Sequence, residues 1–149
     1  MTKQIFQGRP VVPGEIQGEA TVSSKPLNPT SSYGENIFGG NTTSAPCTDP
    51  DNEELVGKDL AGIILCTPQT VGSSMGGGAF MLVADLGLAP KAILFSGHID
   101  AVGAAGILMA DIWQEKPIIC VDLLGEAFQE AVKTGDPISV KEDGTVEVG

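Results

Sequence analysis

Apolar segments of strand length alternate with segments of helical spacing through the second half of the chain. Three continuous apolar runs have the length and composition of buried strands: residues 60–66, 91–95 and 117–121. Three further segments space their apolar residues as a helix does: residues 73–86, 100–111 and 124–133. Because strands that are joined through helices usually run parallel, this order predicts a parallel sheet in the middle of the chain.

Both ends of the chain are richer in strand patterns. Residues 4–23 alternate loosely between apolar and polar side chains, which predicts two or three short strands joined by tight turns. Residues 138–141 and 145–148 flank Asp143-Gly144, a strong hairpin signal. The whole pattern predicts an α/β domain of β/β/α type, in which a mixed sheet forms a barrel-like core with flanking helices.

The periodic pattern is lost between residues 24 and 57. Pro, Ser, Thr, Asn and Gly dominate this stretch, and its charge is concentrated in an acidic run near the end. Structureless loops of this length are uncommon inside a compact domain, and they often act as lids or binding segments. A surface excursion without such a role fits the composition equally well. We expect a single domain over residues 1–149 with a long loop insert at 24–57.

The turn between the predicted strand 60–66 and the predicted helix 73–86 is the first candidate for chemistry. Gly72 permits a tight turn, and Ser73 or Ser74 can cap the new helix. Free backbone N–H groups and the positive end of the helix dipole then meet at one spot, which suits an anion or an ionised serine. Simple capping is the alternative role for either serine.

Three consecutive glycines follow this turn. Gly76, Gly77 and Gly78 each cost helix stability on the order of 1 kcal/mol relative to alanine. Their presence indicates a close approach by another backbone or a ligand. The alternative is that the helix begins only at Ala79 and the glycines belong to the loop.

Composition and charge narrow the range of partners. The chain has 149 residues, of which 42% are hydrophobic, and a formal net charge of −11. This is enough apolar material for a folded core, and the acidic surface argues against nucleic acid and membrane as partners. No apolar run approaches the roughly 20 residues that span a bilayer, and no basic leader opens the chain. We therefore expect a cytoplasmic protein.

Metal-binding patterns are missing from the sequence. Cys47, Cys66 and Cys120 form no Cys-x-x-Cys pair, so we expect no metal or iron–sulfur site held by this chain alone. Cys66 and Cys120 end apolar runs, where a small buried side chain is expected. Cys47 lies in the polar stretch and is either buried or directed toward a group outside the chain.

Patterns typical of hydrolases and nucleotide-binding proteins are missing as well. The single histidine, His98, forms no evident set with a serine and an acid. Residues 71–75 do not make a Gly-x-Ser-x-Gly elbow, and no Gly-Lys-Ser or Gly-Lys-Thr follows the glycines. A prepared anion site without a base or a metal set looks like half of an active site.

Several stretches, in this order, resemble the small swivel-domain subunit of the aconitase X family over nearly the whole chain. None of them is very specific alone, but their order and spacing together are. The stretches are FQGRPVVPGEIQGEA (6–20), GKDLAGI (57–63), TVGS (70–73), APKAI (89–93), AVGA (101–104) and PI (117–118).

The resemblance implies a swivelling β/β/α domain that works with a large subunit, which carries an iron or iron–sulfur centre. It also implies a hydro-lyase that dehydrates a small hydroxy acid. By the match Thr-Val-Gly-Ser, the family's proton-accepting serine corresponds to Ser73. We expect Gly72, Ser74 and Met75 to contact the substrate.

Two acids are candidate substrates by the same resemblance. The stretch 31–55 differs from the shorter version expected of phosphomevalonate dehydratases, and no lysine or arginine cluster near Ser73 offers a phosphate clamp. Both observations favour cis-3-hydroxy-L-proline, with phosphomevalonate as the alternative.

Two hypotheses from other classes compete with this interpretation. Residues 97–102 faintly resemble the loop of phosphotransfer swivel domains, in which a histidine carries phosphate; here that residue is His98. The second hypothesis is that the chain is a non-catalytic interaction module, which would contribute no essential group to its partner.

Overall fold

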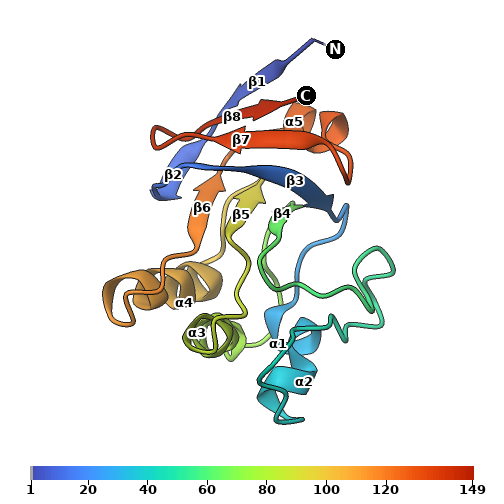
Figure 1. Ribbon diagram of the computed structural model, residues 1–149, viewed down its shortest axis with the longest axis vertical. Coiled ribbons are helices and arrows are strands. Elements are labelled where there is room, and N and C mark those ends of the chain that lie inside the picture. Colours follow the sequence, from blue (N-terminus) through green and yellow to red (C-terminus); the bar gives the residue numbers. More distant parts are fainter. Residues whose placement is uncertain (1) are drawn as a thin grey trace.

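One mixed sheet organises the part of the chain that the computed structural model describes, residues 2–149 (Figure 1). Its strands follow the order β1-β8-β7-β3-β4-β5-β6-β2. The strands are β1 (Gln4–Gln7), β2 (Arg9–Val12), β3 (Ile16–Val22), β4 (Ile64–Thr67), β5 (Ala92–Phe95), β6 (Ile119–Asp122), β7 (Pro137–Val140) and β8 (Thr145–Val148). The helices are α1 (Pro29–Ser32), α2 (Gly34–Ile37), α3 (Gly76–Asp85), α4 (Ala101–Ile112) and α5 (Glu126–Ala131).

The middle of the sheet is parallel and its flanks are antiparallel. Strands β3, β4, β5 and β6 run parallel to one another. Strand β2 joins β6 antiparallel, and β7, β8 and β1 extend the other flank antiparallel from β3. The parallel centre and the terminal hairpin agree with the sequence prediction.

The two edges of this sheet are neighbours in the sequence. Strand β1 lies at one edge and β2 at the other, yet only Gly8 separates them. The N–H of Gly8 donates to the carbonyl of Gly144 at 3.0 Å. A Cβ at position 8 would come within 2.6 Å of the carbonyl oxygen of Asp122, so the backbones approach too closely for a side chain. The sheet therefore curls into a nearly closed barrel, and the predicted barrel-like core is confirmed.

Alternate residues of the parallel strands face two different cores. Leu65 and Ile93 pack toward the helices α3 and α4, whereas Ile64 and Leu94 point into the barrel, where Phe128 of α5 joins them. Successive side chains of a strand point to opposite faces. This arrangement explains why the strands appear in the sequence as continuous apolar runs rather than as an alternation.

Helices α3 and α4 lie together against one face of the sheet, and α1 and α2 lie against α3 (Figure 1). The closest approach joins Gly77 and Gly106: a Cβ at position 106 would come within 2.3 Å of the carbonyl oxygen of Gly77. Helix α3 includes all three glycines, so the alternative start at Ala79 is wrong. The close approach predicted from the glycines is found at Gly77, whereas a Cβ at Gly78 would meet open space.

The stretch 24–57 is not structureless. It contains the two short helices α1 and α2, and five of its side chains are buried in the core: Leu27, Tyr33, Ala45, Cys47 and Leu55. Asn28 caps α1 by accepting the N–H of Ser31 at 3.2 Å, and Pro29 occupies the first helical position. The turn-forming composition hides these short helices in the sequence, and burial of a few apolar residues holds the segment in place.

Two further element boundaries differ from the prediction. The first half of the predicted strand 60–66 is a turn around Gly62, which has φ +71°, so β4 begins only at Ile64. The predicted helix 124–133 shortens to α5, because Gly125 has φ +94° and Leu124 is directed into the barrel core. No helix within residues 2–149 combines the length and the apolar character needed to cross a lipid bilayer.

Candidate active site

The loops that follow β4, β5 and β6 meet at the carboxyl edge of the parallel strands. Backbone hydrogen bonds connect them: the N–H of Gly97 donates to the carbonyl of Pro68 at 2.9 Å, and the N–H of Leu123 donates to Gly97 at 2.9 Å. In α/β folds, whether the sheet is open or closed, ligands bind at the carboxyl ends of the parallel strands. The turn with Ser73 belongs to the first of these loops. We refer to residues 70–75 as the serine turn.

The serine turn is exposed, and the hydroxyl of Ser73 makes two contacts within it. Ser73 Oγ accepts the backbone N–H of Met75 at 3.2 Å. It also lies 3.1 Å from Oγ1 of Thr30, the second residue of α1. Ser73 is solvent-exposed, as are its neighbours from 71 to 75. A reacting group brought from outside can therefore reach this hydroxyl.

Helix α3 begins three residues later than predicted. Its N-cap is Met75, which makes no side-chain capping bond, so neither Ser73 nor Ser74 caps the helix in the predicted way. The N–H of Gly76 instead donates to the carbonyl of Ser73 at 3.0 Å. Within residues 2–149, the only backbone N–H that the hydroxyl of Ser73 accepts is that of Met75, which precedes the first residue of the helix.

Gly72 is required by the shape of the turn. Its φ of +108° is a conformation that favours glycine. A Cβ there would also come within 2.6 Å of Oδ1 of Asn28, the cap of α1. The prediction of a glycine turn at this position is confirmed, and the turn packs directly against the 24–57 stretch.

The backbone of that stretch runs beside the serine turn. The N–H of Leu27 donates to the carbonyl of Gln69 and the N–H of Val71 to the carbonyl of Leu27, both at 2.9 Å. Tyr33, fully buried, packs edge-on against Phe80 of α3 with ring centroids 6.3 Å apart. Residues 27–33 are thus anchored on both sides of the position that Thr30 occupies.

A second contact ties the serine turn to the next loop. The hydroxyl of Thr70 donates to Oδ1 of Asp100, and the same oxygen caps α4 by accepting the N–H of Gly103 at 3.1 Å. Thr70 is buried. This pair fixes the base of the serine turn relative to α4, so Ser73 projects from a supported loop.

The only arginine and the only histidine of the chain lie together at this edge of the sheet. Arg9 Nε and Nη2 donate to the two oxygens of Asp122 at 2.8 and 2.7 Å, and the Asp122 side chain is fully buried. The hydrogen bond to Asp122 raises the pKa of Arg9. Ile99 donates its N–H to the same carboxylate at 3.0 Å.

Both ring nitrogens of His98 have partners. Its Nε2 lies 3.4 Å from Nη2 of Arg9, and its Nδ1 contacts the carbonyl of Ile99. One neutral tautomer satisfies both contacts, with Nδ1 donating and Nε2 accepting. His98 is exposed and its Nε2 keeps the lone pair that a phosphoryl group would need, so these contacts leave the phosphohistidine hypothesis a prediction.

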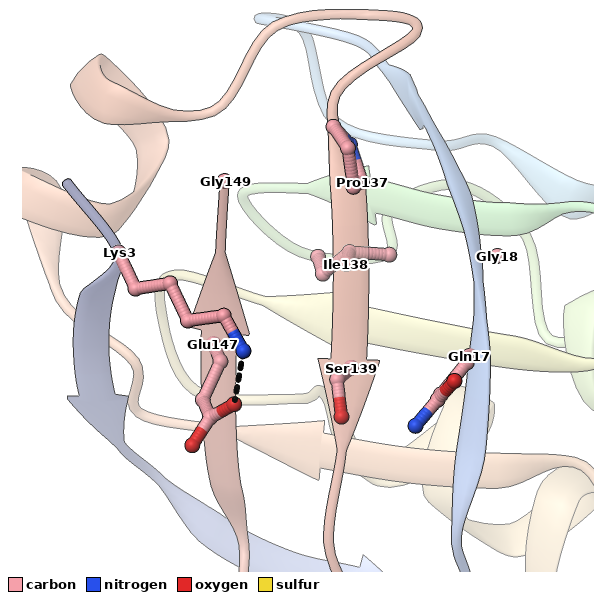
Figure 2. Close-up of a pocket in the computed structure, with 8 residues that line it drawn as sticks. All are labelled: Lys3, Gln17, Gly18, Pro137, Ile138, Ser139, Glu147 and Gly149. Atoms are coloured by element: carbon pink, nitrogen blue, oxygen red, sulfur yellow. Dashed lines mark ion pairs between the residues drawn. The ribbon is translucent and has the colours of Figure 1, made fainter. Parts of the chain in front are cut away.

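The remaining expected contact residues are available to a ligand. Ser74 is exposed, and so are the apolar residues Met75 at 48% and Val71 at 39%. A cavity of about 470 Å³ lies elsewhere, over β3, β7 and β8, where Gln17, Ser139 and the Lys3–Glu147 ion pair line it (Figure 2). None of its lining residues comes from the serine turn. Residues 71–75 of the serine turn are thus open to solvent.

The described chain offers no ligand set for a metal centre. Among residues 2–149 no three His, Cys, Asp or Glu side chains gather as ligands would. All three cysteines are buried: Cys47 and Cys120 in the core under the helices, and Cys66 in the barrel. Burial raises the pKa of the Cys66 thiol to about 12, which disfavours the thiolate that a metal needs. Cys47 packs in the core rather than facing outward.

Thr30 is the neighbour of Ser73 that the sequence did not reveal. Asn28-Pro29 is a recognisable helix start, but no local pattern connects residue 30 with residue 73. Only the packing of the 24–57 stretch against the serine turn brings the two hydroxyl groups together.

Comparison with known proteins assigns this chain to a family. The family model described as aconitase X swivel domain matches residues 5–148. The small subunit of phosphomevalonate dehydratase from Archaeoglobus fulgidus is 33% identical over 144 residues, which cover 96% of this chain and 97% of that one. The corresponding subunit from Thermococcus onnurineus is 30% identical over 145 residues, with 96% and 97% covered.

A solved structure has the same fold. The crystal structure of Thermococcus kodakaraensis aconitase X in its holo-form superposes with a TM-score of 0.80 at 28% identity, and 98% of each chain is covered. The family match, the relatives and the fold agree with one another and with the resemblance seen in the sequence. The chain belongs to the aconitase X swivel domain family.

Proposed function

We propose that this chain is the small subunit of a two-subunit dehydratase, a hydro-lyase in which Ser73 accepts a proton from a small hydroxy acid. The observation that carries the proposal is the exposed hydroxyl of Ser73 at a glycine turn, in a chain that matches the aconitase X swivel domain over residues 5–148. Loss of water from a hydroxy acid needs a base for the proton and assistance for the departing hydroxyl. This chain supplies the base.

A serine hydroxyl is ordinarily a very poor base, so Ser73 has to act in its ionised form. Hydrogen bonds donated to an oxygen favour its charged form. The N–H of Met75 supplies one such bond. Helix α3 begins three residues after Ser73, at Gly76, so the positive end of its dipole also favours a negative charge at this turn.

The large subunit completes the site in this proposal. The surface around Ser73 is open, and the described residues hold no ligand set for a metal. We therefore assign the iron or iron–sulfur centre, together with the group that assists departure of the hydroxyl, to the large subunit.

Phosphomevalonate is the substrate that the comparisons favour. The aligned relatives are phosphomevalonate dehydratase small subunits, and each alignment covers 96% of this chain and 97% of the relative. Such nearly equal coverage indicates chains of similar length, which weakens the argument from a long insert at 31–55 for preferring cis-3-hydroxy-L-proline. We propose phosphomevalonate as the first substrate to test and cis-3-hydroxy-L-proline as the second.

Co-expression with the large subunit tests the proposal. The complex should dehydrate one of the two acids, and Ser73→Ala should lower kcat by at least about 100-fold, the usual contribution of a positioned base. Ser139→Ala, on β7 in the cavity of Figure 2, is the matched control and should leave kcat unchanged.

The rival functions give different results in the same experiment. A non-catalytic module predicts full activity of the Ser73→Ala complex, and that result would overturn the proposal. A phosphotransfer domain predicts acid-labile phosphate on His98 after incubation with a phosphoenolpyruvate-dependent enzyme, and no dehydration of either acid.

A further inference from the structure

The 24–57 stretch places a second hydroxyl directly against the proposed base. Thr30 Oγ1 lies 3.1 Å from Ser73 Oγ, and either oxygen can be the donor while both are neutral. An ionised Ser73 has no proton to give, so Thr30 must then donate. The N–H of Met75 already donates to the same oxygen at 3.2 Å.

We infer that Thr30 is a positioning residue for catalysis, which holds Ser73 Oγ in place and stabilises its ionised form by donating a hydrogen bond. This inference rests on the proposed function, because it takes Ser73 as the base. It gives the long 24–57 stretch a role at the site: to deliver one hydroxyl group to the serine turn.

Several contacts on both sides of Thr30 hold this residue in position. Asn28 caps α1 on one side of it, and Tyr33 anchors the other side in the core. The hydroxyl of Thr48 donates to the carbonyl of Ser31 at 2.6 Å and ties α1 to the far end of the stretch. Residue 30 itself is only half-buried, so its hydroxyl is not needed to fill the core.

Thr30→Val tests the inference in the assembled complex, since valine keeps the branched shape and removes the hydroxyl. Because Thr30→Val removes a hydrogen bond to a charged oxygen, we expect kcat to be roughly 10- to 100-fold lower. KM should change by less than about threefold, because the contact is to Ser73 rather than to the substrate. The pH at which kcat reaches half of its maximum on the rising limb should move up by about 1 unit, because the ionised serine has lost a donor.

Three further variants make the result specific. Thr30→Ser keeps the hydroxyl and should restore kcat and the pH profile. Thr30→Ala removes the hydroxyl without a branched side chain, and it replaces Thr30→Val if that complex does not assemble. Thr43→Val, in the same stretch but bonded to Asn41, is the control and should behave as wild type.

The outcomes separate this inference from the proposed function. Wild-type kcat and pH profile in Thr30→Val, with Ser73→Ala inactive, would overturn the role of Thr30 alone. An active Ser73→Ala complex would overturn the proposed base itself. A lower kcat that Thr30→Ser fails to restore would also count against the inference, because it would point to packing rather than to the hydroxyl.

Discussion

At the scale of single residues, the buried carboxylate of Asp122 depends on its hydrogen-bond partners. Its side chain is fully buried, and Arg9 and the N–H of Ile99 satisfy its oxygens. Burying a charge is costly unless it is paired and hydrogen-bonded. Arg9 thereby joins β2 to the end of β6 beside the loop that carries His98.

We expect Arg9→Gln to lower the melting temperature clearly, because it leaves the Asp122 carboxylate buried without its cation. Adding Asp122→Asn should recover part of the loss, since the asparagine oxygen can still accept the N–H of Ile99. Thermal unfolding of the two variants and wild type measures this. Equal melting temperatures for the single and the double variant would contradict the assigned pairing.

At the scale of elements, the contact between α3 and α4 depends on glycine at one position and not at the next. A Cβ at Gly77 would lie 2.8 Å from the carbonyl oxygen of Val102 and 3.3 Å from the N of Gly106, whereas a Cβ at Gly78 would meet nothing within 4 Å. Both residues lie in the first turn of α3 and differ only in the side of the helix that they face.

These two positions therefore predict stability changes of opposite sign. Gly77→Ala should reduce the free energy of unfolding by about 1–3 kcal/mol, because it forces two backbones apart. Gly78→Ala should raise it by about 0.5–1 kcal/mol, since alanine favours the helix and meets no clash. Urea unfolding at fixed pH compares them, and a loss of similar size in both variants would contradict the described contact.

At the scale of the whole molecule, the buried titratable groups are distributed over the two cores. Burial raises the pKa of Cys66 to about 12, and it also raises the pKa values of Cys120 and Tyr33. An unfolded thiol ionises near pH 8.5. Above that pH the unfolded chain loses protons that the folded chain keeps, so the folded state is progressively disfavoured as the pH rises.

The free energy of unfolding should thus fall as the pH rises above about 9, by about 1.4 kcal/mol per pH unit for each of the Cys66 and Cys120 thiols. Cys66→Ala should make this slope shallower, whatever its effect on stability at pH 7. Urea unfolding between pH 7.5 and 10 measures both slopes. In parallel, a thiol reagent at pH 8 should modify the native protein slowly and all three cysteines after unfolding.

Much of the architecture could be predicted from local pattern. The strands of the parallel centre, the terminal hairpin and the helices α3 and α4 follow from apolar runs, helical spacing and turn residues, because these signals lie within a few neighbouring positions. The glycine turn at Gly72 and the exposed Ser73 follow for the same reason. The short helices α1 and α2 were missed, since each is a single turn held by burial of residues far away in the sequence.

The sequence by itself determined the order of the main strands and the longer helices, the family and the serine at a strand-to-helix turn, because each depends on residues that are close together along the chain. Only the tertiary structure decided that Gly8 closes the barrel, that Gly77 meets Gly106, and that Thr30 reaches Ser73. Such contacts join residues separated by tens of positions. They depend on which strands pair and how loops pack, and no local pattern of side chains records either.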